Sequence, residues 1–174
     1  MTTRAVEAVE GAAASRLRRL AEDVADPELV LVTLGDLGVI RDAVVTDGAA
    51  RVVICPTYSG CPAMATIIRS IVDAARAAGF ERCDVDVELA PPWTTDAITE
   101  RGRNRLRALG IAPPEPVHDD GPTPVRLTAK PPCPRCHSRS TRPLSPHRDF
   151  GSTLCKTNYR CVDCSEMFEY FKAH

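Results

Sequence analysis

A repeated Cys-x-x-Cys pair constrains the C-terminal part of this chain more than any other feature. Cys133-Pro-Arg-Cys136 precedes Cys161-Val-Asp-Cys164, and the 24 residues 137–160 separate the two pairs. A tight turn with a cysteine at each end points two thiolates at one position, and two such turns supply the four sulfurs of a tetrahedral Zn²⁺ site. The sequence therefore predicts a structural zinc bound by Cys133, Cys136, Cys161 and Cys164.

The small size of this module supports the metal. Pro131 to His174 spans 44 residues, which is too few to bury a self-sufficient core. Cys155 is a fifth cysteine there, and it is either a buried spectator or an extra ligand for a labile cluster. Lys156 beside it would favour its thiolate. Four cysteines already complete a tetrahedron, so His137 is interpreted as a surface residue of the ribbon.

A second cysteine motif lies upstream, in Thr57-Tyr-Ser-Gly-Cys61-Pro62. It follows a β-branched run and precedes a segment whose apolar residues recur at helical spacing, so Cys61 is expected at or near a helix N-cap. Pro62 suits the first helical position. Free backbone N–H groups there favour a thiolate, which could act as a nucleophile or a soft-metal ligand. The alternative is a small buried cysteine that precedes a helix.

The chain divides into four predicted parts. These are an N-terminal tail (1–14), an α/β domain (15–110), a proline-rich linker (111–131) and a four-cysteine zinc-ribbon module (132–174). The linker is expected to be a semi-rigid spacer, with an ordered arm packed on the first domain as the alternative.

The α/β domain has a readable order of elements. Helices are expected over 15–25, from Cys61 to Gly79 and over 95–109, and strands over 39–46, 50–55 and 84–89, with Asp47-Gly48 as a hairpin turn. The order α-β-β-α-β-α predicts a mixed α/β (α+β) fold with a small three-stranded sheet covered by helices.

Composition narrows the functional classes. The net charge is −1, so no strong attraction to nucleic acid is expected for the whole chain. No apolar run is long enough for a transmembrane helix or a signal peptide, so no membrane association is expected and the protein should be cytoplasmic. In a reducing compartment, the eight cysteines suggest metal or redox chemistry rather than disulfides.

Several motifs carry a family resemblance. Residues 20–110 resemble the small α/β domain of SufT-like iron–sulfur assembly factors, through Asp26-Pro-Glu28, Asp36-Leu-Gly-Val-Ile40, Thr57-x-x-x-Cys61-Pro62 and Pro92-Trp-Thr94. The tail segments Gly151–Lys156, Tyr159–Cys161 and Phe168–Lys172 are similar to PaaD-like proteins, the D subunits of phenylacetyl-CoA epoxidase systems. Val30 stands where the family often has proline, which alters a turn.

The resemblance implies an accessory, non-catalytic role in phenylacetate catabolism. Such a protein would assist iron–sulfur cluster assembly or delivery to the oxygenase reductase, which has a ferredoxin-type cluster domain, and would contact other epoxidase or assembly proteins. Cys61 would hold iron or a cluster transiently, and Asp26, Glu28 and Thr57 would line the same pocket.

Two other classes stay open. The ribbon could bind nucleic acid or protein, with Phe168, Tyr170 and Phe171 as stacking surfaces. An enzyme with Cys61 as nucleophile would need a base, and residues 1–110 contain no histidine. Trp93 is interpreted as a core or lid residue. Whether the protein is a homodimer is left open.

Overall fold

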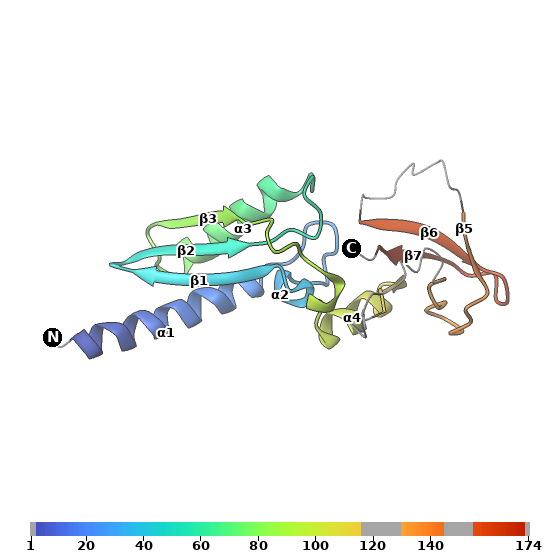
Figure 1. The fold of residues 1–174 in the computed structure, drawn as a ribbon, viewed down its shortest axis with the longest axis horizontal. Coiled ribbons are helices and arrows are strands. Elements are labelled where there is room, and N and C mark those ends of the chain that lie inside the picture. The colour runs from blue at the N-terminus through green and yellow to red at the C-terminus, as the bar shows by residue number, and fades with distance from the viewer. Residues whose placement is uncertain (1–2, 116–129, 145–154, 173–174) are drawn as a thin grey trace. The chain divides into compact units, whose positions relative to one another are not determined.

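The computed structural model describes residues 3–115 (with side chains from Val9), 130–144 and 155–172. It divides into two compact units, one of residues 1–93 and 97–102, the other of residues 94–96 and 103–174. Figure 1 labels their elements. In the ranges described, no helix is both long enough and apolar enough to cross a membrane.

The first unit is a three-stranded sheet with two main helices. The strands β1 (Ile40–Thr46), β2 (Ala49–Ile54) and β3 (Cys83–Val87) lie in the order β1-β2-β3. β1 and β2 form the antiparallel hairpin expected from Asp47-Gly48, and both turn residues have positive φ. β3 runs parallel to β2 after the crossover helix α3 (Met64–Ala77). The predicted α/β architecture is therefore confirmed.

The core of this unit lies between the sheet and its helices. α1 (Thr3–Glu22) contacts β1, α3 contacts β3, and the two helices contact each other, so both cover the same face of the sheet (Figure 1). Leu17 on α1, Val52 on β2 and Ile71 on α3 are at most 1% exposed. The apolar spacing that predicted α3 is this buried face.

Three local features of the first unit differ from expectation. The first helix begins at Thr3 rather than residue 15, because the alanine-rich segment expected as a tail continues the helix. It ends at Glu22, before the expected end at 25. A short helix α2 (Leu34–Leu37) was not predicted; Thr33 caps it, and Gly38 ends it in the left-handed region.

A single turn η1 (Thr95–Ala97) and α4 (Glu100–Ala108) replace the one helix expected over 95–109, and each has residues in both units. The rest of the second unit contains the ribbon. A four-stranded sheet follows, in the order β4-β7-β6-β5. Its strands are β4 (Ile111–Ala112), β5 (Thr141–Pro143), β6 (Lys156–Cys161) and β7 (Met167–Phe171).

The start of the proline-rich segment is not a spacer. Ile111 and Ala112 form β4, which pairs in parallel with Glu169 and Tyr170 of β7. Ala112 is buried in the apolar cluster around the ribbon cysteines. The ribbon is too small to cover its own apolar face, so the first two residues of the predicted linker complete its sheet. Residues 116–129 of the predicted linker lie outside the described ranges.

Candidate functional site

The two Cys-x-x-Cys turns of the second unit have the same backbone geometry. In the first turn the Cys133 N–H donates to the carbonyl of Ser138, and in the second the Cys161 N–H donates to the carbonyl of Glu166. The residue directly after each pair, His137 or Ser165, has a positive φ of 59° or 63°. This left-handed residue closes each turn and directs both sulfurs of a pair to one side.

The four sulfurs converge on one position. The Cys133 and Cys164 Sγ atoms are 3.7 Å apart, and those of Cys136 and Cys161 are 3.6 Å apart. All four lie within 4.8 Å of one another. A tetrahedral site with Zn–S bonds of about 2.3 Å has sulfurs about 3.8 Å apart. The distances therefore fit a four-coordinate zinc.

The surroundings of the four cysteines differ. Cys133 and Cys161 are fully buried, whereas Cys136 is exposed. The backbone N–H of Cys164 is the largest influence that lowers the pKa of Cys161, which falls to about 7. The backbone N–H of Ser138 lowers the pKa of Cys136, but the neighbouring thiols and burial raise it further, to about 12. A metal binds deprotonated thiols, so these two N–H groups also stabilise the metal-bound form.

Neither Cys155 nor His137 belongs to this group. Among the described residues, the only cluster of cysteine, histidine or carboxylate groups close enough to bind a metal is that of the four paired cysteines. Cys155 is half-buried and directly precedes β6. Lys156 forms an ion pair of 3.0 Å with Glu169, and its effect on the Cys155 thiolate stays a prediction.

Cys61 lies in the loop that joins β2 to α3. The N-cap of α3 is Ala63, which makes no side-chain cap bond, so Cys61 precedes the N-cap by two residues. Its N–H donates to the carbonyl of Tyr58 and its carbonyl accepts from Met64, which holds the loop in successive turns. The side chain is half-buried.

The electrostatics of Cys61 differ from expectation. Burial raises the pKa of its thiol above the ordinary value, and the carboxylates of Glu28 and Asp26 raise it further. The backbone N–H groups of Ala63 and Met64 lower the pKa, but they do not offset the burial. The thiolate is therefore not stabilised at rest, because desolvation outweighs the start of the helix.

The structure brings Asp26 and Glu28 close enough to Cys61 to influence its charge. The Asp26 carboxylate accepts the backbone N–H groups of Glu28 and Leu29 at 2.8 and 3.0 Å, which fixes the loop after α1. Thr57 is half-buried in the same β2–α3 loop as Cys61. The roles of these four residues in binding iron stay a prediction.

Asp36 belongs to one of the family motifs, and its role in holding the fold together is visible only in the structure. Its side chain is fully buried, accepts the Thr33 N–H at 3.0 Å and pairs with Arg101 at 2.6 Å. Its own backbone carbonyl accepts the Thr99 N–H. Asp36 thus joins α2 to Arg101 through its carboxylate and to Thr99 through its backbone carbonyl. Trp93 lies beside it and donates from Nε1 to the Leu37 carbonyl at 2.8 Å. A lone aspartate in the sequence gives no signal for such a long-range contact.

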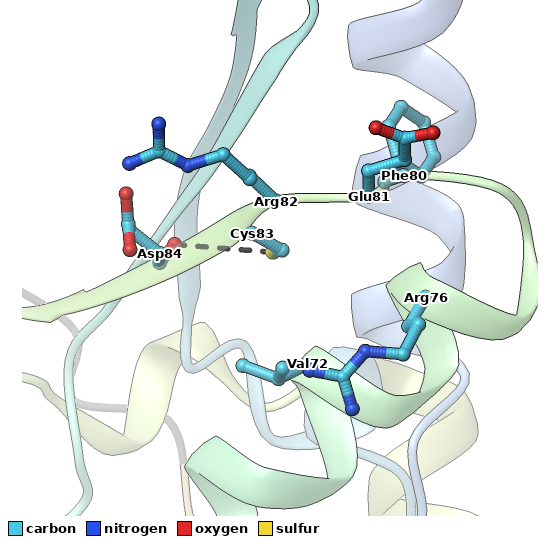
Figure 2. A pocket seen from close by; sticks show the side chains of 7 residues that line it. All are labelled: Val72, Arg76, Phe80, Glu81, Arg82, Cys83 and Asp84. Atoms are coloured by element: carbon cyan, nitrogen blue, oxygen red, sulfur yellow. Dashed lines mark hydrogen bonds between the residues drawn. The ribbon is translucent and has the colours of Figure 1, made fainter.

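Cys83 was also not singled out. Figure 2 shows it on β3, in a pocket with Val72 and Arg76 of α3 on the opposite wall. The pocket measures about 220 Å³. Burial raises the pKa of the Cys83 thiol, and Asp84 raises it further. Cys83 begins β3, whereas Cys61 lies beyond the carboxyl end of the parallel strand β2, so the two thiols are at opposite ends of the sheet.

Comparisons with known proteins agree with this division into two parts. A family model described as an iron–sulfur cluster assembly protein matches residues 14–89. A second, described as the PaaD zinc beta ribbon domain, matches residues 118–172. The first range includes Asp26, Glu28, Thr57 and Cys61, and the second includes both cysteine pairs.

Individual proteins are also similar. A protein of Escherichia coli (strain K12), named as the D subunit of a "Putative 1,2-phenylacetyl-CoA epoxidase", is 41% identical over 155 residues, which are 88% of each chain. The crystal structure of a DUF59 domain of unknown function from Bacillus anthracis matches with a TM-score of 0.54 and 24% identity, over 57% of this chain and 96% of that one. The similarity to the DUF59 domain shows the fold of the first unit. The identity to the Escherichia coli protein shows the family, and this chain belongs to the PaaD family.

Proposed function

We propose that this protein is an accessory subunit of a phenylacetyl-CoA epoxidase system in phenylacetate catabolism. It assists the assembly or delivery of an iron–sulfur cluster to the oxygenase reductase. The observation that carries this proposal is the family membership over nearly the whole chain, combined with an iron–sulfur assembly domain that contains Cys61. The proposal assigns no catalytic step to the protein.

The ribbon contributes stability in this proposal. Cys133, Cys136, Cys161 and Cys164 would hold one zinc, which links the two turns and serves no substrate. The spacing of the sulfurs supports this assignment. Zinc would supply folding free energy that the small core around Phe168 and Ala112 cannot.

Cys61 would handle the iron, which is cargo here and not a resident cofactor. At rest its thiol is protonated, because burial and two carboxylates raise its pKa. The same carboxylates of Asp26 and Glu28 attract a cation, and a bound iron would displace the proton. A thiol that is protonated when the site is empty and deprotonated when iron is bound suits transient binding.

The test is client loading. The reductase is co-expressed with wild-type protein, with Cys61→Ala or with Cys83→Ala, and its iron and sulfide content is measured after anaerobic purification. Cys83→Ala is the matched control, because that thiol is also half-buried with a raised pKa but lies at the other end of the sheet. We expect loading to fall with Cys61→Ala alone. Equal loading with all three proteins would refute the role of Cys61.

A further inference from the structure

We propose that the end of the first unit around Cys61 is a docking surface for a partner protein that presents apolar side chains together with Lys or Arg. This inference deepens the proposed function and rests on it. Within the described residues, the first unit exposes seven large hydrophobic side chains. Five of them belong to the segments around Cys61 and form what we call the apolar rim: Val30, Leu31, Tyr58, Val87 and Leu89.

Backbone hydrogen bonds bring the three rim segments to one end of the sheet. The Glu88 N–H donates to the Ile54 carbonyl, so the residues after β3 start beside the β2–α3 loop. The Cys55 N–H donates to the Val39 carbonyl, which joins that loop to the chain before β1. Figure 1 shows the loop between α1 and α2 and the β2–α3 loop at this same end of the sheet.

The rim is exposed on an ordered loop. Val30 is 74% exposed and Leu31 is 60% exposed. Their loop is closed by a hydrogen bond of 2.8 Å from the Asp26 N–H to the Val32 carbonyl, and Val32 itself is fully buried. Fixing two apolar side chains in water costs free energy that a partner would recover by covering them.

The charge around the rim selects the partner. Segments 23–33, 55–64 and 87–92 carry four acidic residues and no lysine, arginine or histidine. The acidic residues are Asp23, Asp26, Glu28 and Glu88. Two arginines of other elements lie near these segments: Arg41 donates to the Pro91 carbonyl, and Arg101 is paired with Asp36. Residues 1–93 contain nine arginines and fourteen acidic residues, a net charge of −5. A second copy docked rim to rim would bring like charges together, whereas a cationic surface complements them.

The experiment uses the purified reductase of the epoxidase system as the probe and the full-length protein as the titrant. Calorimetry gives Kd at low and at physiological salt. Val30→Asp combined with Leu31→Asp should weaken binding by about tenfold or more. Glu28→Lys should weaken it at low salt and reduce the salt dependence. Val44→Asp is the matched control, because Val44 is 41% exposed on β1, outside the rim, and should bind as the wild type does.

The remaining outcomes separate this proposal from the proposed function. Cys61→Ala should bind normally and fail to load the reductase. A rim variant that keeps its melting temperature and binds within twofold of wild type overturns the docking surface, even if loading needs Cys61. If binding depends on the rim but loading does not depend on Cys61, the docking surface is supported and the cargo role of Cys61 is refuted. Two further results would overturn this choice of partner. One is that the wild-type protein does not bind the reductase. The other is that the rim variants abolish self-association of the protein, measured by sedimentation, and not its binding to the reductase.

Discussion

Replacing Asp36 with alanine tests the account of how the first unit is held together. The carboxylate is fully buried and accepts the Thr33 N–H at 3.0 Å, while Thr33 Oγ1 accepts the Asp36 N–H at 3.2 Å. These two bonds form a capping box at the start of α2. The same carboxylate binds Arg101 at 2.6 Å. Asp36→Ala therefore removes one bond of the capping box and the ion pair with Arg101 together, and it leaves the backbone bond from Thr99 in place.

The expected cost follows from these contacts. Asp36→Ala leaves the part-buried Thr33 N–H without its acceptor, which costs about 1–2 kcal/mol. The other half of the capping box, from the backbone N–H of residue 36 to Thr33 Oγ1, remains. The Arg101 side chain is 59% exposed and regains water, so the broken ion pair adds little. We expect the free energy of unfolding to fall by about 1–2 kcal/mol, which for a domain of roughly 100 residues lowers Tm by about 5–15 °C.

Trp93 provides the assay. It is the single tryptophan of the chain, is 4% exposed and donates to the carbonyl of Leu37, next to Asp36. Its fluorescence during urea and thermal unfolding reports on this part of the fold directly. Asp73→Ala is the control, because Asp73 is 61% exposed on α3. A Tm for Asp36→Ala within about 2 °C of wild type would show that the buried carboxylate is not an anchor.

Three further changes have expected outcomes. Gly38→Ala should destabilise the first unit by more than about 2 kcal/mol, measured by urea unfolding, because φ is +64° and the new Cβ would lie 2.2 Å from a carbonyl oxygen. Cys136→Ser should lose the zinc, measured by metal analysis, and its ribbon should become sensitive to protease. Cys155→Ser should keep one zinc per chain. Equal zinc content in the two variants would contradict the assignment of the four ligands. Because its pKa is raised, Cys61 should be alkylated slowly at pH 7.5 and faster as the pH rises past about 9. Glu28→Gln removes one of the carboxylates that raise the pKa of Cys61, so it should speed alkylation at a fixed pH. An unchanged rate would show that this carboxylate does not act on the thiol.

Local signals in the sequence predicted the elements that depend on local chemistry. Asp47-Gly48 supplies two residues that tolerate positive φ, and both adopt it in the hairpin. The apolar spacing after Cys61 predicted α3, because one face of a helix against a sheet has that period. The paired cysteines predicted the group whose sulfurs converge, because each turn needs only four residues to set its geometry.

Features set by distant contacts could not be read in this way. β4 forms because β7 leaves an edge that Ile111 and Ala112 complete, and no pattern in two residues indicates a strand. The pKa of Cys61 depends on burial and on carboxylates more than thirty positions away, while the sequence shows only the start of a helix. Asp36 meets Arg101 across 65 positions, which is beyond any periodic signal.

The pairing of β4 with β7 changes what the proline-rich segment can do. The described residues on either side of 116–129, in β4 and in the first cysteine turn, belong to the same compact unit. The segment therefore connects two parts of one unit rather than one unit to the other. Its length enters the stability of the ribbon through loop-closure entropy, at only about 0.6 kcal/mol per doubling. Lengthening it would leave the covalent connection between the units unchanged, because the chain passes from one unit to the other within residues 93–103.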